Sequence, residues 1–525
     1  MMGFAPVRRF AAISALLILV GARPAAACTG DCNADGRVTI DELVQAVGIA
    51  LGVTAASVCP AADANGGGEV TIDELVAAVT AGLDGCPPMA PTETPTADAA
   101  TPTESPTTPT PPLAPTATPT PTSGPFLRFC DLPGSLQFTE GGKVLVPGGP
   151  SEAPDLSWLE LPVGFCAHYY GRVGNARQLR FAPGGELFVA SPVTLTTGGR
   201  GDQGRREIVI LPDDDRDGSA DGVITFLDEL PSTQGMLFAN GYFYYQDRTR
   251  IVRRPYAAGE RAPSEPLEEV VDIGTATGRF QDRLHWPKML DIADDGTIFV
   301  TNGGDQSESC DLSRPFRGGI FKIDGTPGGA PVAKGFRNPI TVRCARGFNR
   351  CFAIELAKDY TAALGGREKL VPVREGDDWG HPCCATANQP YPGLNPAPDC
   401  SAIGREGGAF VIGHTPFDLD FETGKWPPPW NNRAYVPMHG VFATWEGARV
   451  VSIGMDPITG EVIMGSELPA DDPGSLLEFA SGWDDGRKAG GPQGRPANVT
   501  FAPDGRLFLG NDNTGDIIWI APLGL

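Results

Sequence analysis

The sequence predicts an all-β, six-bladed β-propeller preceded by a small α-helical, calcium-binding module. Three observations predict it: one hairpin pattern recurs six times between residues 126 and 525, two calcium-loop patterns stand near the amino terminus, and a Pro/Thr-rich stretch separates them. A chain of 525 residues is too long for one ordinary domain, which agrees with two bodies.

The amino terminus, residues 1–27, has the pattern of a cleaved secretory signal peptide. Two arginines precede an apolar run over 10–20, and three alanines end at residue 27 as a small-residue cleavage site. The twin-arginine route and a lipid on Cys28 are weaker interpretations, because two arginines alone are a poor signal and no Leu stands where a lipobox needs it. We expect a secreted or periplasmic protein without a membrane span.

The next segment, residues 28–87, carries two loops with the donor spacing of calcium sites. In "GDCNADGRVTIDEL" the donors are Asp31, Asn33, Asp35, the backbone carbonyl of Arg37, Thr39 and Glu42. In "DANGGGEVTIDEL" the matching donors are Asp63, Asn65, Thr71 and Glu74. Gly67 replaces the acid at position 5 of the second loop, so we expect that loop to bind calcium more weakly.

This pair of loops resembles the duplicated calcium loops of dockerin and EF-hand modules. The dockerin resemblance implies a cohesin-like partner, although Glu42 and Glu74 stand where dockerins carry Asp, as EF-hands do. The alternative is a small calcium-stapled domain without a partner. Four cysteines lie in or beside the module and are candidates to staple it: Cys28, Cys32, Cys59 and Cys86.

Residues 88–125 are rich in Pro, Thr, Ala and Ser and hold no Lys or Arg. Such a composition cannot bury a core, so we expect an extended linker between two independent bodies.

The six repeats of residues 126–525 each show an apolar alternation, a turn and a second alternation, which is the pattern of a β-hairpin. They begin at Leu179, Gly235, Met289, Ile340, Phe417 and Val499. Most are followed by a third apolar strand, as in "EIVILPD" and "IIWIAP". Small antiparallel sheets repeated at such spacing predict a propeller, and six copies predict six blades.

Twelve cysteines in an exported chain suggest disulfides. Cys344 and Cys351 flank one predicted hairpin turn, while Cys383 and Cys384 pair either with each other or, for one of them, with Cys400. The formal net charge of −23 argues against nucleic acid or an anionic membrane as a partner.

Polar residues stand just before three of the repeats. His285 precedes "MLDIADDG", Arg337 and Asn338 precede the fourth repeat in "GFRNP", and Arg495 precedes the last in "GRPANV". Propellers bind ligands with loops from several blades at one end of the central channel. We therefore expect His285, Arg337 and Arg495 to converge at one end, with Asn338 and Trp379 nearby.

With these motifs the chain from Leu161 to Pro522 resembles the quinoprotein glucose and sorbosone (aldose sugar) dehydrogenases, which bind pyrroloquinoline quinone (PQQ) and calcium. The resemblance includes Arg-Asn-Pro at 337–339 and "REGDDWGHP" at 374–382. It implies oxidation of a sugar or related alcohol, with electrons passed to an external acceptor. His285 would be the catalytic base, and the quinone would be bound by Arg337, Asn338, Arg495, Lys288 and Trp379.

A second acidic motif, "DDDRDGSAD", places Asp213, Asp215, Asp217 and Asp221 in a DxDxDGxxD pattern. Such a cluster repels itself without a cation, so calcium binding is one hypothesis and a solvated acidic turn is the other.

The alternative to a dehydrogenase is a non-redox, calcium-binding propeller joined to an anchoring domain, either a lactonase-like hydrolase or a carbohydrate-binding module. A lactonase of that type needs carboxylate and Asn ligands that converge on a metal, and no such set stands at matching repeat positions. Reconstitution with PQQ and calcium separates the two hypotheses.

Overall fold

The computed structural model describes most of the propeller and part of the amino-terminal module. The described residues are 28–32, 37–50, 58–64, 67, 70–84, 128–193, 204–274, 285–304, 310, 318–358, 365–441, 444–468, 472–486 and 491–525. The chain divides into two compact units, Met1–Thr118 and Pro119–Leu525. The signal peptide and linker predictions lie outside the described residues, as do Asn33, Asp35 and Asn65.

In the amino-terminal unit, α1 (Ile40–Ala50) and α2 (Ile72–Asp84) contact each other. Each begins at the tenth residue of its calcium-loop pattern, and the twelfth loop residue folds back on the ninth. Glu42 Oε2 accepts the backbone N–H and the hydroxyl of Thr39, at 2.8 and 2.9 Å. Glu74 does the same with Thr71, at 2.9 and 2.8 Å. These two contacts cap the helix starts.

Two cysteines of this unit, Cys32 and Cys59, form a disulfide that spans the first loop and helix. No helix within the described residues is long and apolar enough to cross a membrane.

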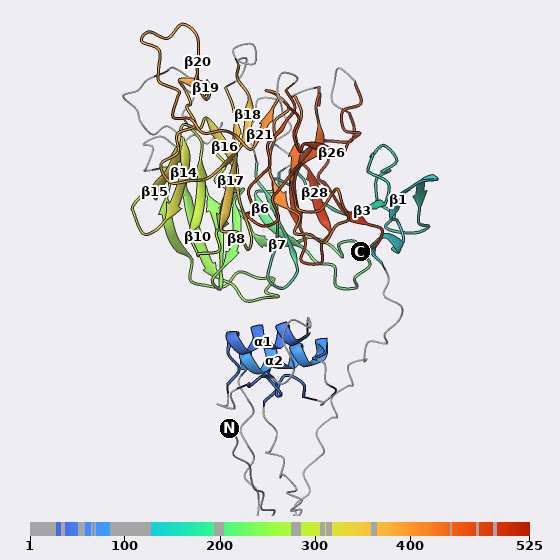
Figure 1. The fold of residues 1–525 in the computed structure, drawn as a ribbon. Helices are drawn as coiled ribbons and strands as arrows, with labels where there is room; N and C mark the ends of the chain where they lie inside the picture. The colour runs from blue at the N-terminus through green and yellow to red at the C-terminus, as the bar shows by residue number, and fades with distance from the viewer. Residues whose placement is uncertain are drawn as a thin grey trace, which may run out of the picture. The chain divides into compact units, whose positions relative to one another are not determined.

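The second unit is a six-bladed β-propeller, as the repeats predicted (Figure 1). Blade one is β4 (Gln178–Phe181), β5 (Leu187–Ser191), β6 (Glu207–Leu211) and β7 (Ile224–Leu227), and blade two is β8 (Met236–Ala239), β9 (Tyr242–Asp247), β10 (Arg250–Pro255) and β11 (Glu268–Asp272). Blade three is β12 (Leu290–Ile292), β13 (Ile298–Asn302), β14 (Gly319–Ile323) and β15 (Ala330–Lys334).

The other three blades follow the same order with additions. Blade four is β16 (Asn338–Ala345), β17 (Arg350–Leu356), β18 (Glu368–Pro372), β21 (Gly408–Phe410) and β25 (Gly465–Ser466), and blade five is β22 (Asp420–Phe421), β23 (Arg433–Met438), β24 (Arg449–Gly454) and β26 (Leu477–Ala480). Blade six is β27 (Pro496–Phe501), β28 (Leu507–Asn511) and β29 (Asp516–Pro522), extended by β3 (Phe165–Arg172), β1 (Leu136–Thr139) and β2 (Gly142–Leu145). A separate hairpin, β19 (Cys384–Thr386) and β20 (Gln389–Pro390), stands outside the blades.

Blade six closes the ring, because its fourth strand comes from the beginning of the propeller. β3 pairs antiparallel with β29, so that Phe165 lies opposite Pro522 and Arg172 opposite Asp516. This pairing joins strands from opposite ends of the propeller sequence. Both β3 and β29 therefore have a paired neighbour where the ring closes.

The first strands of the blades surround the propeller axis. They contact one another in a closed ring: β4 with β8, β8 with β12, β12 with β16, β16 with β22, β22 with β27, and β27 with β4. Because the blades repeat the same antiparallel order, all first strands begin at one end of the ring and all second strands finish there. We call this end the mouth and the end with the first hairpin turns the base.

The hairpins form where the sequence predicted them. In the last repeat, β27 and β28 flank the turn Pro503–Arg506, where Gly505 has φ +101° and takes a left-handed conformation that disfavours other residues. All five residues of β28 are buried because this strand has paired neighbours in the sheet and packs on both faces.

The disulfides follow the cysteine pattern. Cys344–Cys351 links the β16–β17 hairpin, and Cys384–Cys400 resolves the alternatives for the adjacent cysteines. The remaining described pairs of the propeller are Cys130–Cys166 and Cys310–Cys383.

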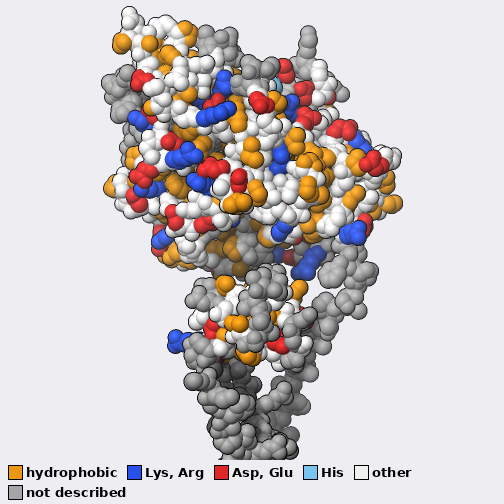
Figure 2. All heavy atoms as spheres, viewed as in Figure 1, with side chains coloured by type: hydrophobic (Ala, Val, Ile, Leu, Met, Phe, Trp, Pro, Cys, Tyr) orange, Lys and Arg blue, Asp and Glu red, His pale blue; other side chains and the backbone are white. Residues whose placement is uncertain are grey.

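The surface of the propeller is mixed in charge. Figure 2 shows acidic and basic side chains interspersed over the viewed face.

Candidate functional site at the propeller mouth

Three residues singled out in the sequence stand at strand ends of the mouth. His285 lies five residues before β12, Arg337 lies directly before β16, and Arg495 lies directly before β27. All three precede the first strand of a blade, so they occupy the same end of the ring in blades three, four and six. Of the three side chains, those of His285 and Arg495 are buried and that of Arg337 is partly exposed.

His285 is held by the backbone of its own blade. Its Nδ1 lies 3.1 Å from the carbonyl oxygen of Gly304. A carbonyl oxygen only accepts, so Nδ1 carries the proton in this contact and the ring's basic lone pair is at Nε2. His285 also has φ +58°, a costly conformation for a residue with a side chain.

Gly303 explains how His285 reaches this position. A Cβ atom at residue 303 would lie 2.3 Å from the Cβ of His285 and 2.4 Å from its carbonyl oxygen. The second strand of blade three therefore ends in glycine where the His285 backbone crosses it.

Gly304 also connects His285 to Arg337. The N–H of Gly304 donates to the Arg337 carbonyl oxygen at 2.7 Å, while the Arg337 N–H donates to Glu355 Oε1 at 2.7 Å. Burial raises the pKa of Glu355 to about 7, against the opposing effects of the Arg337 N–H and of Lys369. Glu355, near the end of β17, is thus a buried carboxyl group beside Arg337, which was predicted from the sequence.

Arg495 belongs to a second group of charges around Asp512. The Asp512 Oδ2 accepts from Arg177 at 2.9 Å, from His439 Nε2 at 2.9 Å and from Arg495 at 3.5 Å. The Arg495 guanidinium also stacks on Trp445, 4.7 Å from the ring centroid. Blades one, five and six therefore meet at one carboxylate.

The ionisation of this group is set by its surroundings. Burial opposes the charge on Asp512, yet His439, Arg495 and Arg177 together hold its pKa well below the usual value. Burial, reinforced by Arg495, lowers the pKa of His439 to about 4, so this imidazole is neutral at pH 7. The group carries a carboxylate between two guanidinium ions.

Sequence reasoning missed Arg177 and Asp512, but a signal for Arg177 was present. Arg177, Arg337 and Arg495 each occupy the position directly before the first strand of a blade. Asp512 directly follows a second strand, β28, which is the matching position on the other side of the mouth.

Lys288 and Trp379 are both buried, in different surroundings. Lys288 precedes β12, its N–H donates to Gln246 Oε1 at 3.0 Å, and burial lowers the pKa of its amine to about 7. Trp379 packs in a hydrophobic cluster with Phe336, Val371 and the Cys384–Cys400 disulfide, so its ring belongs to the core between blades three and four.

Polar atoms without partners gather at the mouth. Side chains at the start of a first strand or the end of a second strand have buried N or O atoms with no hydrogen-bond partner among the described residues. They are Arg177, Gln178, Thr233, Gln234, Asn302, Asn338, Glu355 and Asp512. Such atoms are costly to bury, and proteins keep them where water or a ligand satisfies them. Five of the six blades contribute to this set.

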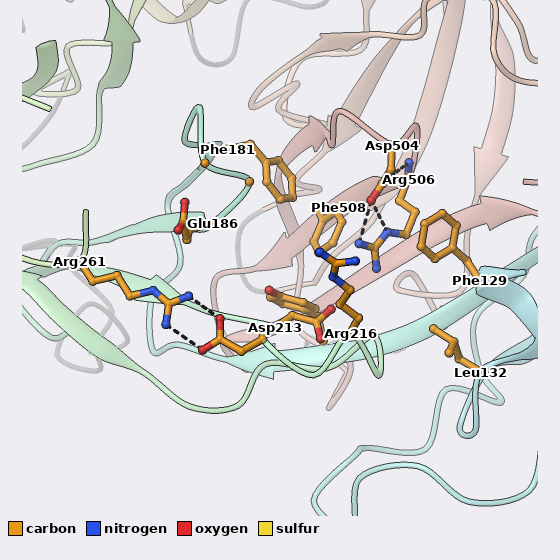
Figure 3. Close-up of a pocket in the computed structure, with 15 residues that line it drawn as sticks. Phe129, Leu132, Phe181, Glu186, Asp213, Arg216, Arg261, Asp504, Arg506 and Phe508 are labelled. Atoms are coloured by element: carbon orange, nitrogen blue, oxygen red, sulfur yellow. Dashed lines mark hydrogen bonds and ion pairs between the residues drawn. The ribbon is translucent and has the colours of Figure 1, made fainter. Parts of the chain in front are cut away.

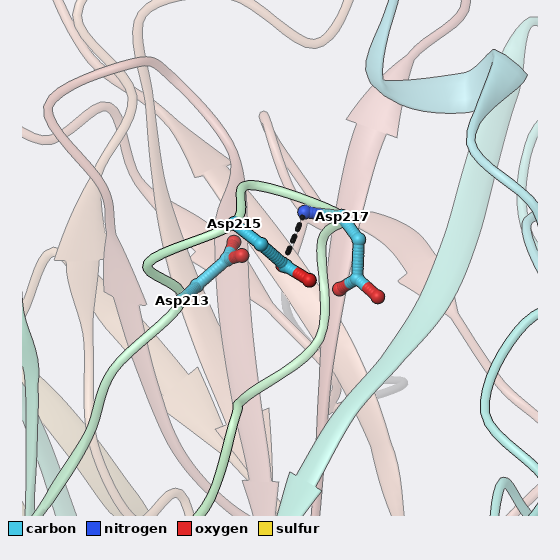
Figure 4. Close-up of side chains that lie close together, drawn as sticks. All are labelled: Asp213, Asp215 and Asp217. Atoms are coloured by element: carbon cyan, nitrogen blue, oxygen red, sulfur yellow. Dashed lines mark hydrogen bonds between the residues drawn. The ribbon is translucent and has the colours of Figure 1, made fainter. Parts of the chain in front are cut away.

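The acidic motif lies at the base, in the loop between β6 and β7. Carboxylate oxygens of Asp213, Asp215 and Asp217 come within 4.8 Å of one another (Figure 4). Asp221 instead accepts the N–H of Asp214 at 2.6 Å. The loop is therefore folded on itself, and the calcium hypothesis for it stays a prediction.

Comparison with known proteins gives a likeness in fold. No protein-family model and no curated protein matches the chain. A carbohydrate-active enzyme of family AA12 from Trichoderma reesei is similar in structure, with a TM-score of 0.54 at 15% identity over 71% of this chain and 100% of that one. The PQQ domain of a pyranose dehydrogenase from Coprinopsis cinerea, in its holo form, has a TM-score of 0.53 at 13% identity, covering 70% and 98%. A calcium structure of the Trichoderma reesei family AA12 enzyme has a TM-score of 0.53 at 16% identity, covering 69% and 97%. The chain thus shares its six-bladed fold with these proteins.

Proposed function

We propose that the protein is an exported quinoprotein oxidoreductase that binds PQQ and calcium at the mouth and oxidises a sugar or related alcohol. Electrons pass to an external acceptor. The observation that carries the proposal is His285, whose ring is fixed by the Gly304 carbonyl with its basic nitrogen at Nε2. It stands at the end of the ring where five blades contribute polar atoms without partners.

The residues of the mouth fit a flat, tricarboxylate quinone. Arg337 and Arg495 offer planar guanidinium groups that suit carboxylates, and the buried Arg177 Nε has no partner among the described residues. Gln178 and Asn302 add amide donors of the same kind. These donors, with Lys288 and Asn338, would hold the cofactor.

An oxygen for calcium is present beside them. Glu355 Oε2 is buried and has no partner among the described residues, while Oε1 is fixed by the Arg337 N–H. A hard cation binds carboxylate oxygen, so Glu355 is the side chain we assign to calcium. When bound, the quinone supplies a two-electron acceptor and calcium withdraws electron density from it.

His285 does the proton work in this proposal. Its Nε2 takes the proton of the substrate hydroxyl as the carbon-bound hydrogen leaves with its electron pair. The Gly304 carbonyl holds the tautomer that this step needs, a task that a carboxylate performs for many catalytic histidines. Gly303 keeps the backbone of His285 in place for it.

The structural neighbours and the disulfides support the proposal. One neighbour is named as a PQQ domain and another as a calcium structure. Disulfides persist in oxidising compartments, which agrees with a secreted or periplasmic location.

We also propose that the amino-terminal unit binds calcium at the first loop more tightly than at the second. Asp31 and Glu42 are buried, as a cation between them requires, and Gly67 has no side chain to contribute. Calorimetry with calcium should give one stronger site that Glu42→Gln weakens more than Glu74→Gln does. Equal losses from the two variants would contradict this ranking. A cohesin-like partner for this unit stays a prediction.

Reconstitution tests the main proposal. The purified protein is mixed with PQQ and calcium, its absorption spectrum is recorded, and dye reduction is measured over a panel of aldoses and alcohols. We expect a bound-quinone spectrum and dye reduction with at least one substrate. Absence of quinone binding by the folded protein would reject the proposal and favour the non-redox alternative.

A further inference from the structure

The base of the propeller holds a pocket of about 430 Å³ (Figure 3). Most of its residues come from the first hairpin turns of blades one and six, from the β6–β7 loop and from η2 (Phe129–Asp131). Arg261 comes from the β10–β11 loop and Tyr170 from β3. The hairpin turns follow the first strands of their blades, and the β6–β7 loop follows a third strand. The residues of the mouth instead precede first strands or follow second strands. The pocket is therefore at the end opposite His285.

Aromatic rings form the apolar wall of this pocket. Phe181 and Phe508 meet edge to face with centroids 4.9 Å apart. Phe129 is covered by the guanidinium of Arg506, 4.3 Å from its ring centroid. Stacked and edge-to-face contacts of this kind hold rings in fixed orientations.

Two arginine–carboxylate pairs form the polar rim. Arg261 pairs with Asp214 through both of its terminal nitrogens, one at 2.8 Å. Arg506 pairs with Asp504 at 2.9 and 3.1 Å. Figure 3 shows these pairs at separate sides of the pocket, with Glu186 and Phe181 between them on one side. A carboxylate in such a pair keeps lone pairs for further donors.

Two more carboxylates of the pocket carry unused acceptors. Asp213 Oδ1 and Glu186 Oε2 are buried atoms with no hydrogen-bond partner among the described residues. Burial raises the pKa of Asp213, while Arg506 opposes that rise. Buried acceptors of this kind need a donor from water or from a ligand.

We infer that this pocket binds a saccharide, which donates hydroxyl groups to Asp213 and Glu186 and lays an apolar ring face on Phe181. The lining includes four carboxylates, Glu186, Asp213, Asp214 and Asp504, against three arginines, so an anionic ligand is disfavoured. An apolar ligand would leave the carboxylate oxygens without donors. The volume lies within the range of small-ligand sites.

The pocket is an accessory site, separate from the proposed redox chemistry, and the inference does not rest on that chemistry. A saccharide held at the base and a hydroxyl group oxidised at the mouth would occupy opposite ends of one ring. The pocket would therefore anchor the protein to a carbohydrate chain and leave the mouth open.

Calorimetry on the full chain tests the inference. The probes are soluble β-1,4-linked oligosaccharides of glucose, xylose, mannose and N-acetylglucosamine, and calcium alone as a separate titration. We expect at least one oligosaccharide to bind, and Phe181→Ala to weaken its Kd by about tenfold through lost ring contact. Asp213→Asn should weaken it by a similar factor, since a charged acceptor is lost.

Controls separate the pocket from the mouth and from misfolding. Phe181→Leu keeps much of the packing volume and should also weaken binding. Asp228→Asn, directly after β7 at the other end of blade one, changes one exposed acidic charge outside the pocket and should not weaken binding. Arg495→Ala, at the mouth, should bind the oligosaccharide as the parent protein does. Thermal unfolding confirms that each variant is folded.

Three results would overturn the inference. They are binding of none of the oligosaccharides, binding that Phe181→Ala and Asp213→Asn leave unchanged, and a calcium titration in which Asp213→Asn removes one site while no oligosaccharide binds. The last result would make the base a cation site.

Discussion

The first strands of the propeller bury polar groups in two opposite ways along their length. In the interior of the ring, Arg343 on β16 donates twice to Asp418, at 3.1 and 2.8 Å, and Thr341 adds a bond of 2.9 Å. The two charged side chains are 1% and 2% exposed. At the mouth, equally buried polar atoms of Gln178 and Asn302 have no partner among the described residues.

The difference separates a structural use of polar burial from a functional one. A buried pair whose charged groups bond to each other adds rigidity, although Arg343 Nη1 itself has no partner among the described residues. A buried group without a partner costs stability, and only a ligand or water recovers that cost. We therefore expect the unpartnered groups of the mouth to cost stability that a bound ligand would recover, whereas the Arg343–Asp418 pair needs no ligand to neutralise its charges.

The largest expected effect is on turnover at the mouth. His285→Ala should lower kcat by about 10²–10⁴-fold, because a positioned general base contributes that much. Quinone binding should persist, since the arginines and amides proposed to hold the cofactor remain. Dye reduction and the bound-quinone spectrum measure the two properties separately, and loss of both together would make His285 a structural residue.

The next effect is on stability in the interior. Asp418→Ala should lower the free energy of unfolding by about 3–5 kcal/mol, because it leaves Arg343 buried without its partner. Urea unfolding measures it. The double variant Arg343→Met, Asp418→Leu should regain most of the loss, as no buried charge is then unpaired. A double variant as unstable as Asp418→Ala would show that the pair stabilises in its own right.

The sequence predicted the blades because each hairpin is local. The turn at Gly505 and the alternation around it lie within a dozen residues, so the period-2 pattern and the turn residue are both visible. The closing pair of β3 and β29 was invisible, because Phe165 and Pro522 are joined only by tertiary structure. The Cys344–Cys351 disulfide was predictable because its two cysteines flank one hairpin turn. The Cys310–Cys383 disulfide was not, because its cysteines lie far apart in the sequence.

The mouth was predictable only in part. His285, Arg337 and Arg495 were identified by their position before repeats and by resemblance, and the structure puts them at one end of the ring. Asp512 and Gln178 were not identified, because each lies at the end of a strand within a hairpin repeat that is recognised by its apolar residues. Their importance comes from convergence across blades, which a linear pattern does not contain.

A titration distinguishes the mouth from an ordinary buried carboxylate. Burial raises the pKa of Glu355 from 4.5 to about 7. Between these values the folded protein keeps a proton that the unfolded chain has released, so the free energy of unfolding falls as pH rises, by about 3 kcal/mol in all. Glu355→Gln should remove this fall, which unfolding by urea at pH 4.5 and at pH 7 measures.

Glu467 is the matched control for that titration. Burial favours its neutral form, but His414 and Arg449 outweigh burial and lower its pKa. The free energy of unfolding that ionised Glu467 contributes is therefore present above its unfolded pKa and is lost as pH falls. This pH dependence has the opposite sign to that of Glu355. Glu467→Gln should flatten the acidic side of the stability profile, and a flattening of the same side by Glu355→Gln would contradict the assignment of a raised pKa.

The smallest expected effect is a gain in the free energy of unfolding, whereas most substitutions lower it. Both amide atoms of Gln178 are buried without a partner among the described residues, so Gln178→Met should stabilise the protein by about 1 kcal/mol while weakening quinone binding. Gln246 lies at the same end but donates to Arg248 and Trp286 and accepts from Lys288. Gln246→Met should therefore destabilise. Urea unfolding and quinone titration of the two variants test whether unpaired polar groups at the mouth exist for a ligand; equal destabilisation by both would mean that water already satisfies Gln178.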